Sequence, residues 1–307
     1  MRESSERGKE VEILVKFQRH GLREGTRLTD LGRQITQERA EQGGWSVGDT
    51  EDEARFDAAK AIGSSADTPQ ATPENPRPLS RALETAHITA ATVAGERAGT
   101  WNPRPDERLN YNTLRSPAPY DHILVYNRAL SEAIRALGKG DQDLKDLKDE
   151  EKLRVTEAAQ NGVMEHVHML RTPEAEQWKR ENAGMFADMI EHYIEMTRYL
   201  KNNSRVMYAA GTHGGAMEWL LQQALTRTDA DGRTTVGLDS LAEIGGGFQS
   251  SDAYNVDIKT DKRGKLQTLG ITFDNPQRPQ GEMYLDLDKL HELAAFYRGL
   301  HQKQGGE

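Results

Sequence analysis

The chain has 307 residues, of which 36% are hydrophobic and 29% are charged, so it is long enough to form one large domain or two modest ones around a sizeable core. Its 40 Lys and Arg against 49 Asp and Glu give a net charge of −9, and an acidic chain is a poor candidate for general nucleic-acid binding because the phosphate backbone favours positive surfaces. The sequence contains no cysteine, which excludes disulfides, thiolate metal sites and a cysteine nucleophile.

The N-terminal sequence MRESSERGKE is charged, and no apolar run long enough for a signal peptide follows it. No uninterrupted apolar run approaches the roughly 18 to 20 residues that a membrane helix needs. We therefore expect a cytoplasmic protein that has neither a membrane nor a nucleic acid as its partner.

The first third of the chain alternates between strand and helix patterns. Residues 11–17, VEILVKF, are almost continuously apolar and rich in β-branched residues, which indicates a buried strand. Residues 29–40 predict a helix with Thr29 as its N-cap, and residues 55–63 predict a second, weaker strand. The four prolines of residues 64–79 indicate a loop after that strand.

The middle of the chain is mainly helical by its sequence pattern. Ser80 precedes a helix whose apolar residues recur at helical spacing on one face. Helical patterns follow near 122–137 and 142–160. A long helix is expected from residue 172, with Pro173 in the first turn, where the missing N–H group costs nothing.

The last third returns to the alternation. Residues 205–211 predict a short strand and residues 214–225 the helix after it, while 253–258 and 265–273 flank the turn TDKRG of a hairpin. An amphipathic helix is expected at 287–300. Strands that alternate with helices predict an α/β fold, which we expect to be a three-layer α/β/α sandwich with a mostly parallel central sheet and the hairpin toward one edge.

Two of the predicted buried strands end in histidine followed by glycine. The first strand leads into RHG at 19–21, and the strand RVMYAAG leads into THG at 212–214. In a parallel α/β sheet, ligands bind at the carboxyl ends of the strands, so His20 and His213 can face one pocket. A glycine beside each histidine would let a ligand approach the backbone closely.

An arginine at the start of a predicted helix adds to this pair. Arg81 lies in the first turn, where its planar donor fork joins a helix N-terminus already suited to anions. Two arginines, Arg19 and Arg81, and two histidines that converge on one cavity would form a phosphate site. A neutral imidazole can also attack phosphorus and carry the phosphoryl group covalently.

Four motifs occur in a fixed order along the chain: FQRHG, LTDLGRQ, SRALETA and GTHGG. Together they resemble the histidine phosphatase superfamily, also called phosphoglycerate mutase-like, of the branch 1 type. The resemblance is spread over about the whole chain, with gaps at 41–79 and 101–170. It implies a single domain over residues 1–307, in which these two excursions form loops or a helical cap over the site.

The resemblance also implies a role for each matched residue. His20 is the nucleophile that becomes phosphohistidine, and Arg19 and Arg81 clamp the phosphoryl oxygens. His213 donates a further hydrogen bond to the phosphoryl group. The residues expected to bind substrate beside them are Gly21, Arg23, Thr212 and Gly214.

The sequence departs from the family at the general acid. A glutamate in a segment resembling L-x-E usually protonates the leaving oxygen, whereas here Leu109 is followed by NYN. We predict that Glu107 substitutes for it; Asp106, Tyr111 and a residue from elsewhere in the chain are the alternatives. Removal of general acid catalysis typically costs about 100- to 10,000-fold in rate.

The sequence EHVH at 165–168 is the one pattern that suggests a metal pair. Two histidines at this spacing face the same side only if the segment is a strand, and no third ligand is evident. We therefore expect no metal site, no cofactor and an activity that is independent of metal ions.

The expected activity is hydrolysis of phosphomonoesters through a phosphohistidine on His20, with a phosphorylated small molecule or a phosphoprotein as the partner. Two alternatives remain. A phosphoglycerate mutase would need a closed pocket that keeps water out between two transfers. A catalytically weak phosphate-binding module that lacks the usual acid would bind phosphate without turnover.

Overall fold

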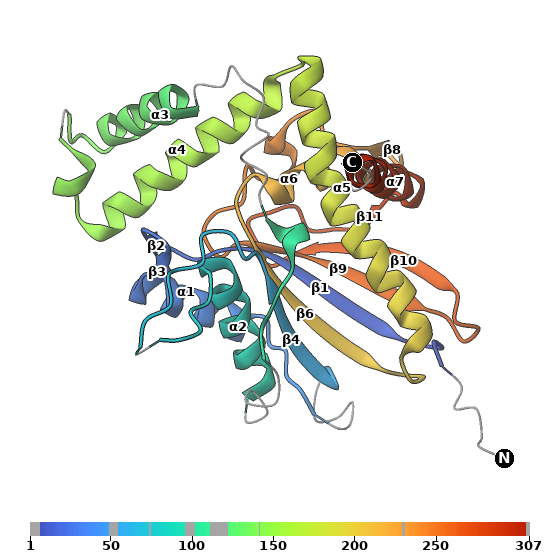
Figure 1. The fold of residues 1–307 in the computed structure, drawn as a ribbon. Helices are drawn as coiled ribbons and strands as arrows, with labels where there is room; N and C mark the ends of the chain where they lie inside the picture. Colours follow the sequence, from blue (N-terminus) through green and yellow to red (C-terminus); the bar gives the residue numbers. More distant parts are fainter. Residues whose placement is uncertain are drawn as a thin grey trace.

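The computed structural model describes residues 7–48, 55–73, 75–95, 102–110, 122–140, 142–228 and 231–304. Within these ranges the chain has an α/β fold, built on a central sheet of nine strands (Figure 1). In spatial order the strands are β5 (Arg104–Pro105), β4 (Ala58–Gly63), β6 (Arg205–Thr212), β1 (Glu12–Arg19), β9 (Ala253–Thr260), β10 (Leu266–Phe273), β11 (Met283–Leu285), β7 (Leu225–Thr228) and β8 (Thr234–Val236). A separate two-stranded sheet consists of β2 (Arg23–Glu24) and β3 (Arg27–Leu28).

The sheet is mixed, and this corrects the expectation of a mostly parallel one. β5, β4, β6 and β1 are parallel to one another, whereas every pairing from β1 through β9, β10, β11 and β7 to β8 is antiparallel. The predicted hairpin exists as β9 and β10, but β9 pairs with β1 in the middle of the sheet rather than near an edge. The later strands β11, β7 and β8 extend the sheet beyond the hairpin.

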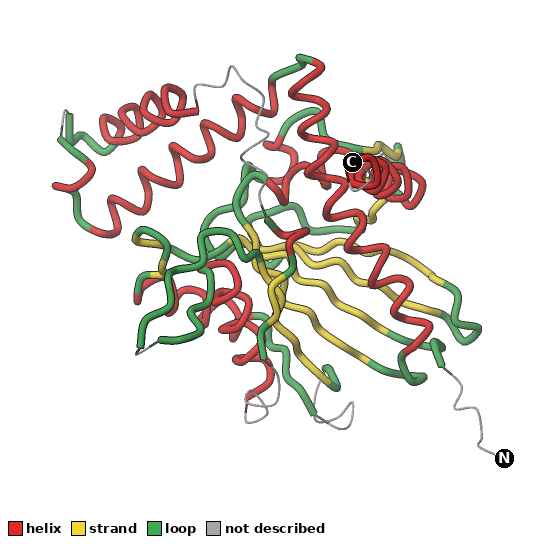
Figure 2. The backbone as a smooth tube through the Cα atoms, viewed as in Figure 1, coloured by secondary structure: helices red, strands yellow, loops and turns green. Residues whose placement is uncertain are grey.

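Helices pack on both faces of this sheet (Figures 1 and 2). The side chains of β1 alternate between two apolar clusters: Ile13, Val15 and Phe17 belong to the larger one and Leu14 to the smaller one. The larger cluster is shared with α5 (Pro173–Met196), α6 (Ala216–Ala224) and α7 (Leu287–Gln304). The smaller cluster is shared with α2 (Arg81–Ala94), against which α1 (Asp30–Gln42) packs.

The predicted helix starts are confirmed by their caps. The side chains of Thr29, Ser80 and Thr172 each accept a hydrogen bond from a backbone N–H three residues on, at the starts of α1, α2 and α5. Pro173 occupies the first turn of α5, as expected. These caps fix the first residue of each helix, which matters most for α2, because Arg81 is that residue.

A pair of helices projects from the body of the molecule (Figure 1). α3 (His122–Ala136) packs against α4 (Asp149–Met169) around a small apolar cluster of its own. The C-terminal part of α4 joins the main core through Met164 and Val167. The sequence pattern placed this helix at 142–160, whereas α4 begins at Asp149 and runs on to Met169.

Four short 3-10 helices complete the described elements: η2 (Glu107–Leu109), η4 (Leu144–Asp146), η5 (Thr197–Tyr199) and η6 (Leu241–Ile244). None of the helices in the described ranges is both long enough and apolar enough to cross a membrane.

Candidate active site

The parallel pairing of β1 with β6 brings the two histidine motifs together. Arg19 and Thr212 are opposite each other in the register, so His20 and His213 leave neighbouring strands at the same edge. The backbone N–H of His20 donates to the carbonyl oxygen of Thr212 at 2.9 Å. The centroids of the two imidazole rings are 5.3 Å apart.

Helix α2 delivers Arg81 to the same edge because two glycines let it pack directly on the strands. A Cβ built on Gly211 of β6 would lie 1.9 Å from the carbonyl oxygen of Ala82, and one on Gly63 of β4 would lie 2.6 Å from the Cα of Leu83. No other residue type permits this approach. Arg81 therefore reaches the strand ends, where its Nη2 lies 3.4 Å from Nδ1 of His213.

The four side chains Arg19, His20, Arg81 and His213 form one buried cluster, in which each residue is between 4% and 7% exposed. The Nε groups of both arginines are buried donors without a hydrogen-bond partner in the described part of the chain. An unpaired buried donor costs free energy, so two of them in a positively charged cluster indicate a site that an anion completes.

The loop that precedes β9 holds the guanidinium of Arg19 through a hydrogen bond. Its Nη1 donates to the carbonyl oxygen of Phe248, and the N–H of Phe248 donates to the buried carboxylate of Glu218 at 3.0 Å. Burial lowers the pKa of Arg19, while the charges of Glu218, Glu157 and Asp252 counteract this shift. These carboxylates lie near enough to stabilise the buried positive charge without pairing with it directly.

His20 carries a neutral imidazole. Burial, followed by the positive charge of Arg19, holds its pKa well below the usual value of a histidine. Its Nδ1 lies 2.8 Å from the carbonyl oxygen of Gly21, and the hydrogen-bond pattern assigns the proton to Nδ1 as the donor. The lone pair of Nε2 is therefore available for attack.

His213 is fixed by a chain of hydrogen bonds that the sequence did not predict. Its Nε2 lies 2.9 Å from Oγ of Ser64, whose hydroxyl donates to Oδ1 of Asn110 at 2.6 Å. This assigns the proton of the neutral ring to Nε2 and turns Nδ1 toward Arg81. Burial, followed by the charge of Arg81, lowers the pKa of His213 to about 4.

This shift makes the stability of the protein dependent on pH. The unfolded chain binds a proton at His213 near pH 6.5, whereas the folded chain binds it only near pH 4, so acidification between these values favours unfolding. We expect this group alone to reduce the free energy of unfolding by about 3 kcal/mol once the pH reaches about 4. Urea unfolding of the wild type and of His213→Gln between pH 7.5 and 4.5 measures the difference.

The NMR titration of the ring protons provides an independent check. The resonances of His213 should titrate near pH 4, and their assignment is checked by their loss in His213→Gln. A midpoint for His213 near 6.5, or an unfolding curve of His213→Gln that follows the wild type at every pH, would contradict the prediction.

The residues predicted to bind substrate lie at the cluster, but three of them are occupied by the protein itself. A Cβ on Gly21 would lie 2.9 Å from Oγ1 of Thr36, and one on Gly214 would lie 2.8 Å from Nε of Arg19. The hydroxyl of buried Thr212 donates to the carbonyl oxygen of Leu109. The two glycines therefore make room for neighbouring protein groups. This corrects the expectation that they let a ligand approach the backbone.

Arg23 is the predicted substrate residue that remains accessible. It lies exposed in β2, and its Nη1 donates to the carbonyl oxygen of Gly25 at 3.1 Å. Its positive charge lowers the pKa of both Arg81 and His213, after the larger effect of burial. Arg23 thus lies within electrostatic reach of the cluster and faces solvent.

The carboxylates predicted as the acid are not bonded to the cluster. Asp106 forms an ion pair with Arg108 at 2.8 Å; burial alone would raise the pKa of Asp106, but the hydrogen bonds and charge of Arg108 lower it. Glu107 is exposed in η2, and its carboxylate makes no hydrogen bond or ion pair within the described residues. Tyr111 lies outside the described residues.

The loop after β4 supplies two functional candidates that sequence reasoning missed. Ser64 follows the C-terminal end of β4 and holds His213, and Asp67 forms an ion pair with Arg81 at 2.9 Å. The rule that parallel strands present ligand-binding residues at their carboxyl ends, applied to the predicted strand 55–63, would have identified Ser64. No sequence pattern indicates Asp67, because residues 64–79 are predicted only as a loop.

The histidines of EHVH do not form a metal pair. The segment belongs to α4, so the condition that it be a strand is not met. His168 is buried and its Nε2 lies 2.7 Å from the carbonyl oxygen of Asp239, while His166 is exposed. No group of three or more metal-ligating side chains is present within the described ranges.

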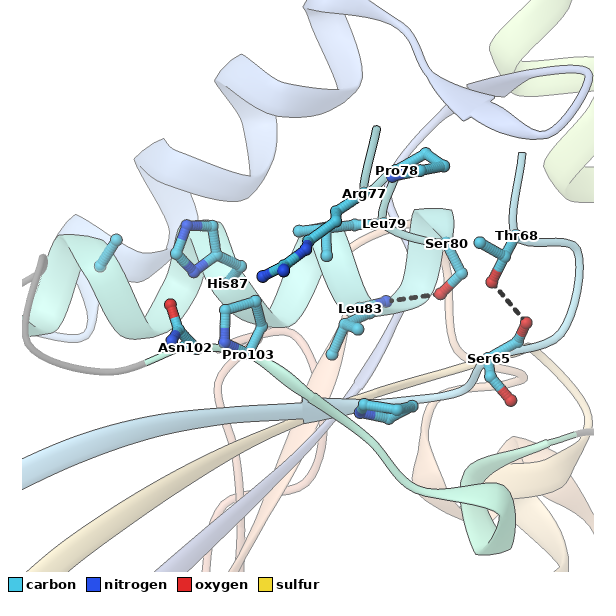
Figure 3. Close-up of a pocket in the computed structure, with 12 residues that line it drawn as sticks. Ser65, Thr68, Arg77, Pro78, Leu79, Ser80, Leu83, His87, Asn102 and Pro103 are labelled. Atoms are coloured by element: carbon cyan, nitrogen blue, oxygen red, sulfur yellow. Dashed lines mark hydrogen bonds between the residues drawn. The ribbon is translucent and has the colours of Figure 1, made fainter. Parts of the chain in front are cut away.

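A cavity of about 770 Å³ lies along α2 and β5, and none of the four cluster side chains belongs to its described lining. Its wall includes Ser65, Thr68 and Ser80, which adjoin Ser64, Asp67 and Arg81 in the chain (Figure 3). Arg77 and His87 add polar groups to it, and Leu83 and Pro103 add apolar surface. A volume of this size suits a small organic ligand.

Comparisons with known proteins give limited similarity. No family model matches the chain, and no curated protein matches it. Among solved structures, a mycobacterial glucosyl-3-phosphoglycerate phosphatase is similar at 15% identity and a TM-score of 0.28, over 85% of this chain and 96% of that chain. The phytase from D. castellii is similar at 9% identity and a TM-score of 0.39, over 94% of this chain and 79% of that chain.

The motif order and the geometry of the site therefore carry the family resemblance. RHG, SRALETA and THGG lie on β1, α2 and β6 and the turns that follow the two strands, and the structure gathers their arginines and histidines in one buried cluster. In these features the chain resembles the histidine phosphatase superfamily.

Proposed function

We propose that the protein is a phosphatase that hydrolyses phosphomonoesters through a phosphohistidine on His20. One observation carries this proposal: a neutral imidazole with a free Nε2 lies among two buried arginines whose Nε donors have no partner in the described chain. A phosphoryl group supplies the negative charge and the acceptors that this cluster lacks. Phosphoryl transfer depends mainly on positioning and charge stabilisation, which these groups provide.

The proposed reaction has two steps. Nε2 of His20 attacks phosphorus, the bond to the ester oxygen breaks, and that oxygen takes a proton from a general acid. Water then attacks the phosphohistidine, the P–N bond breaks, and the acid is restored by the proton that water loses. Arg19 and Arg81 hold the transferring oxygens through both steps, His213 joins them as a donor when the bound phosphoryl dianion favours a proton on its Nδ1, and the sequence assigns the acid to Glu107.

The proposed architecture is a single three-layer α/β/α domain in which α3 and α4 form a cap over the site. Support comes from the contact of α4 with the loop that holds Arg19. The carboxylate of Glu157 accepts a hydrogen bond from the N–H of Ser250 at 2.9 Å, two residues after Phe248. The charge of Glu157 also acts on Arg19, so the middle of α4 lies close to the cluster.

The cavity along α2, whose wall includes Ser80 next to Arg81 in the chain, is the proposed site for the leaving group. It is lined by both apolar and polar side chains, with Arg77 and His87 among the latter (Figure 3). A phosphorylated small molecule, or a phosphorylated side chain of a protein, would place its phosphoryl group in the cluster and its organic part here. We also propose that the protein acts in the cytoplasm.

Trapping the intermediate tests the proposal. Rapid mixing with p-nitrophenyl phosphate, an alkaline quench and peptide mass spectrometry should find one added phosphoryl group on the peptide that contains His20. Treatment with EDTA should leave the yield unchanged, because the two arginines supply the positive charge. Phosphorylation of another residue, or turnover without any trapped intermediate in His20→Ala and wild type alike, would refute the mechanism.

A parallel incubation separates the alternatives. With 3-phosphoglycerate and a bisphosphoglycerate primer, a mutase would interconvert the phosphoglycerates, whereas the proposed phosphatase releases inorganic phosphate or leaves this substrate untouched. A phosphate-binding module would bind inorganic phosphate and release none from any ester, however long the incubation.

A further inference from the structure

The proposed phosphatase needs a proton donor for the leaving oxygen, and Asn110 cannot be one. Asn110 follows Leu109, where the resemblance leads one to expect an acid. Its Oδ1 instead accepts hydrogen bonds from Oγ of Ser64 and from the backbone N–H groups of Ser65 and Ala66, at 2.6, 2.9 and 3.2 Å. An amide that is held in this way organises the loop after β4.

That loop carries a carboxylate to the cluster. Oδ2 of Asp67 lies 2.9 Å from Nη2 of Arg81, the same nitrogen that lies 3.4 Å from Nδ1 of His213. Within the described residues, Asp67 is the carboxylate that pairs with one of the four cluster side chains. Its side chain is 53% exposed, so it stands at the open side of the cluster rather than beneath it.

The conformation of Asp67 is held by its neighbours. Its φ of 58° lies in the left-handed region, which is uncommon for a residue other than glycine and costs free energy. Asn110 fixes the turn before it, and the hydroxyl of Thr68 donates to the carbonyl oxygen of Ser65 at 2.6 Å after it (Figure 3). Strain that is maintained by specific bonds is typical of functional positions.

We propose that Asp67 is the general acid of this site, in the role that the sequence assigned to Glu107; this inference rests on the proposed phosphatase function. A phosphoryl group that binds Arg81 displaces the carboxylate of Asp67 from the guanidinium. The carboxylate then lies beside a dianion, and like charge favours its protonated form. Asp67 also lies between Ser65 and Thr68, which line the cavity proposed for the leaving group.

The step balances as follows. Nε2 of His20 forms a bond to phosphorus as the P–O ester bond breaks, and the proton of the Asp67 carboxyl moves to the departing oxygen, giving a neutral alcohol. In the second half, the Asp67 carboxylate takes a proton from the attacking water as the P–N bond breaks. Free phosphate and protonated Asp67 result, and Asn110 acts as a positioning residue throughout.

A series of leaving groups tests this role. Asp67→Asn should lower kcat/KM for glycerol phosphate by about 100- to 10,000-fold, because an alkoxide leaves poorly without a proton. The loss for 2,4-dinitrophenyl phosphate, whose leaving group needs no proton, should be at least about tenfold smaller. Retained activity on that ester also shows that the variant is folded.

The pH profile and matched variants complete the test. The fall of kcat with rising pH on glycerol phosphate should disappear in Asp67→Asn, while Asp67→Glu restores part of the rate. Glu107→Gln, made in parallel, tests the competing assignment, while Asp288→Asn, at an exposed position of α7, should keep both the wild-type rate and the wild-type profile.

Three results would overturn the inference. An equal loss on both esters would show that Asp67 only positions Arg81. Wild-type behaviour of Asp67→Asn, with the leaving-group effect found in Glu107→Gln, would return the acid to Glu107. Failure of the wild type to form phosphohistidine even with 2,4-dinitrophenyl phosphate would refute the phosphatase function itself, a distinct outcome that removes the inference with it.

Discussion

Replacement of His20 by alanine is expected to reduce phosphomonoester turnover by roughly 10⁴- to 10⁶-fold, the effect of removing a covalent nucleophile from its site. The remaining arginines would still bind the phosphoryl group, so the loss should appear in kcat rather than in affinity for inorganic phosphate. Initial rates with p-nitrophenyl phosphate, together with isothermal titration of phosphate, measure the two effects separately.

The fold should survive this change. Among the residues that the structure describes, the ring of His20 bonds only to the carbonyl oxygen of the next residue, Gly21, and its backbone bond to Thr212 is independent of the side chain. His166→Ala, at an exposed position in α4, is the matched control and should keep full activity. Substantial turnover by His20→Ala with an unchanged near-ultraviolet circular dichroism spectrum would exclude His20 as the nucleophile.

Arg81→Ala should have the next largest effect on catalysis. Loss of one preorganised donor to a transferring group typically costs about 100- to 1000-fold. Arg81 in addition carries positive charge at the first turn of α2, so inhibition by inorganic phosphate should weaken in the same variant. Rates on p-nitrophenyl phosphate and the inhibition constant of phosphate give the two numbers.

Two further variants show whether the geometry of the guanidinium matters. Arg81→Lys keeps the charge but not the planar fork, and should fall between the wild type and Arg81→Ala. Arg263 lies in the exposed turn between β9 and β10 and belongs to none of the motifs. Arg263→Ala removes one positive charge there and should change neither the rate nor the inhibition by phosphate. Equal rates for Arg81→Ala and Arg263→Ala would contradict the role of Arg81.

The elements that carry the motifs could be predicted because their signals are local. The apolar run of β1, the cap of Ser80 at α2 and the strand β6 all follow from short stretches of sequence, and the structure places them as expected. Their parallel pairing then follows from the general rule for alternating strands and helices. The sequence alone therefore predicts that His20, His213 and Arg81 lie at one edge of the sheet.

The errors concern features that depend on distant parts of the chain. The hairpin β9–β10 was recognised from its turn, but its place beside β1 is set by pairing across more than two hundred residues, which no local pattern encodes. The start of α4 was placed too early because charged residues 142–148 read as helix, although the acidic cluster Asp149, Glu150 and Glu151 favours the true N-terminus.

The acid was the part of the site that the sequence could least define. The resemblance points to the segment after β5, where Glu107 and Asp106 lie. Loop residues between 64 and 79 have no periodicity, so the contact of Asp67 with Arg81 depends on how Asn110 folds that loop. Only the three-dimensional arrangement relates these two stretches.

The direct packing of α2 on Gly63 and Gly211 has a consequence for how this site can change over time. The backbone of α2 lies directly against the backbone of the two strands, so no side chain between them could be substituted to change the distance of the helix from the sheet. Even one methyl group on either glycine would collide with Ala82 or Leu83. The distance between the guanidinium of Arg81 and the two imidazoles is thereby fixed by the packing of α2 on the sheet. Adaptation to new substrates must therefore come from the loops and the projecting helical pair, which are free to vary in length.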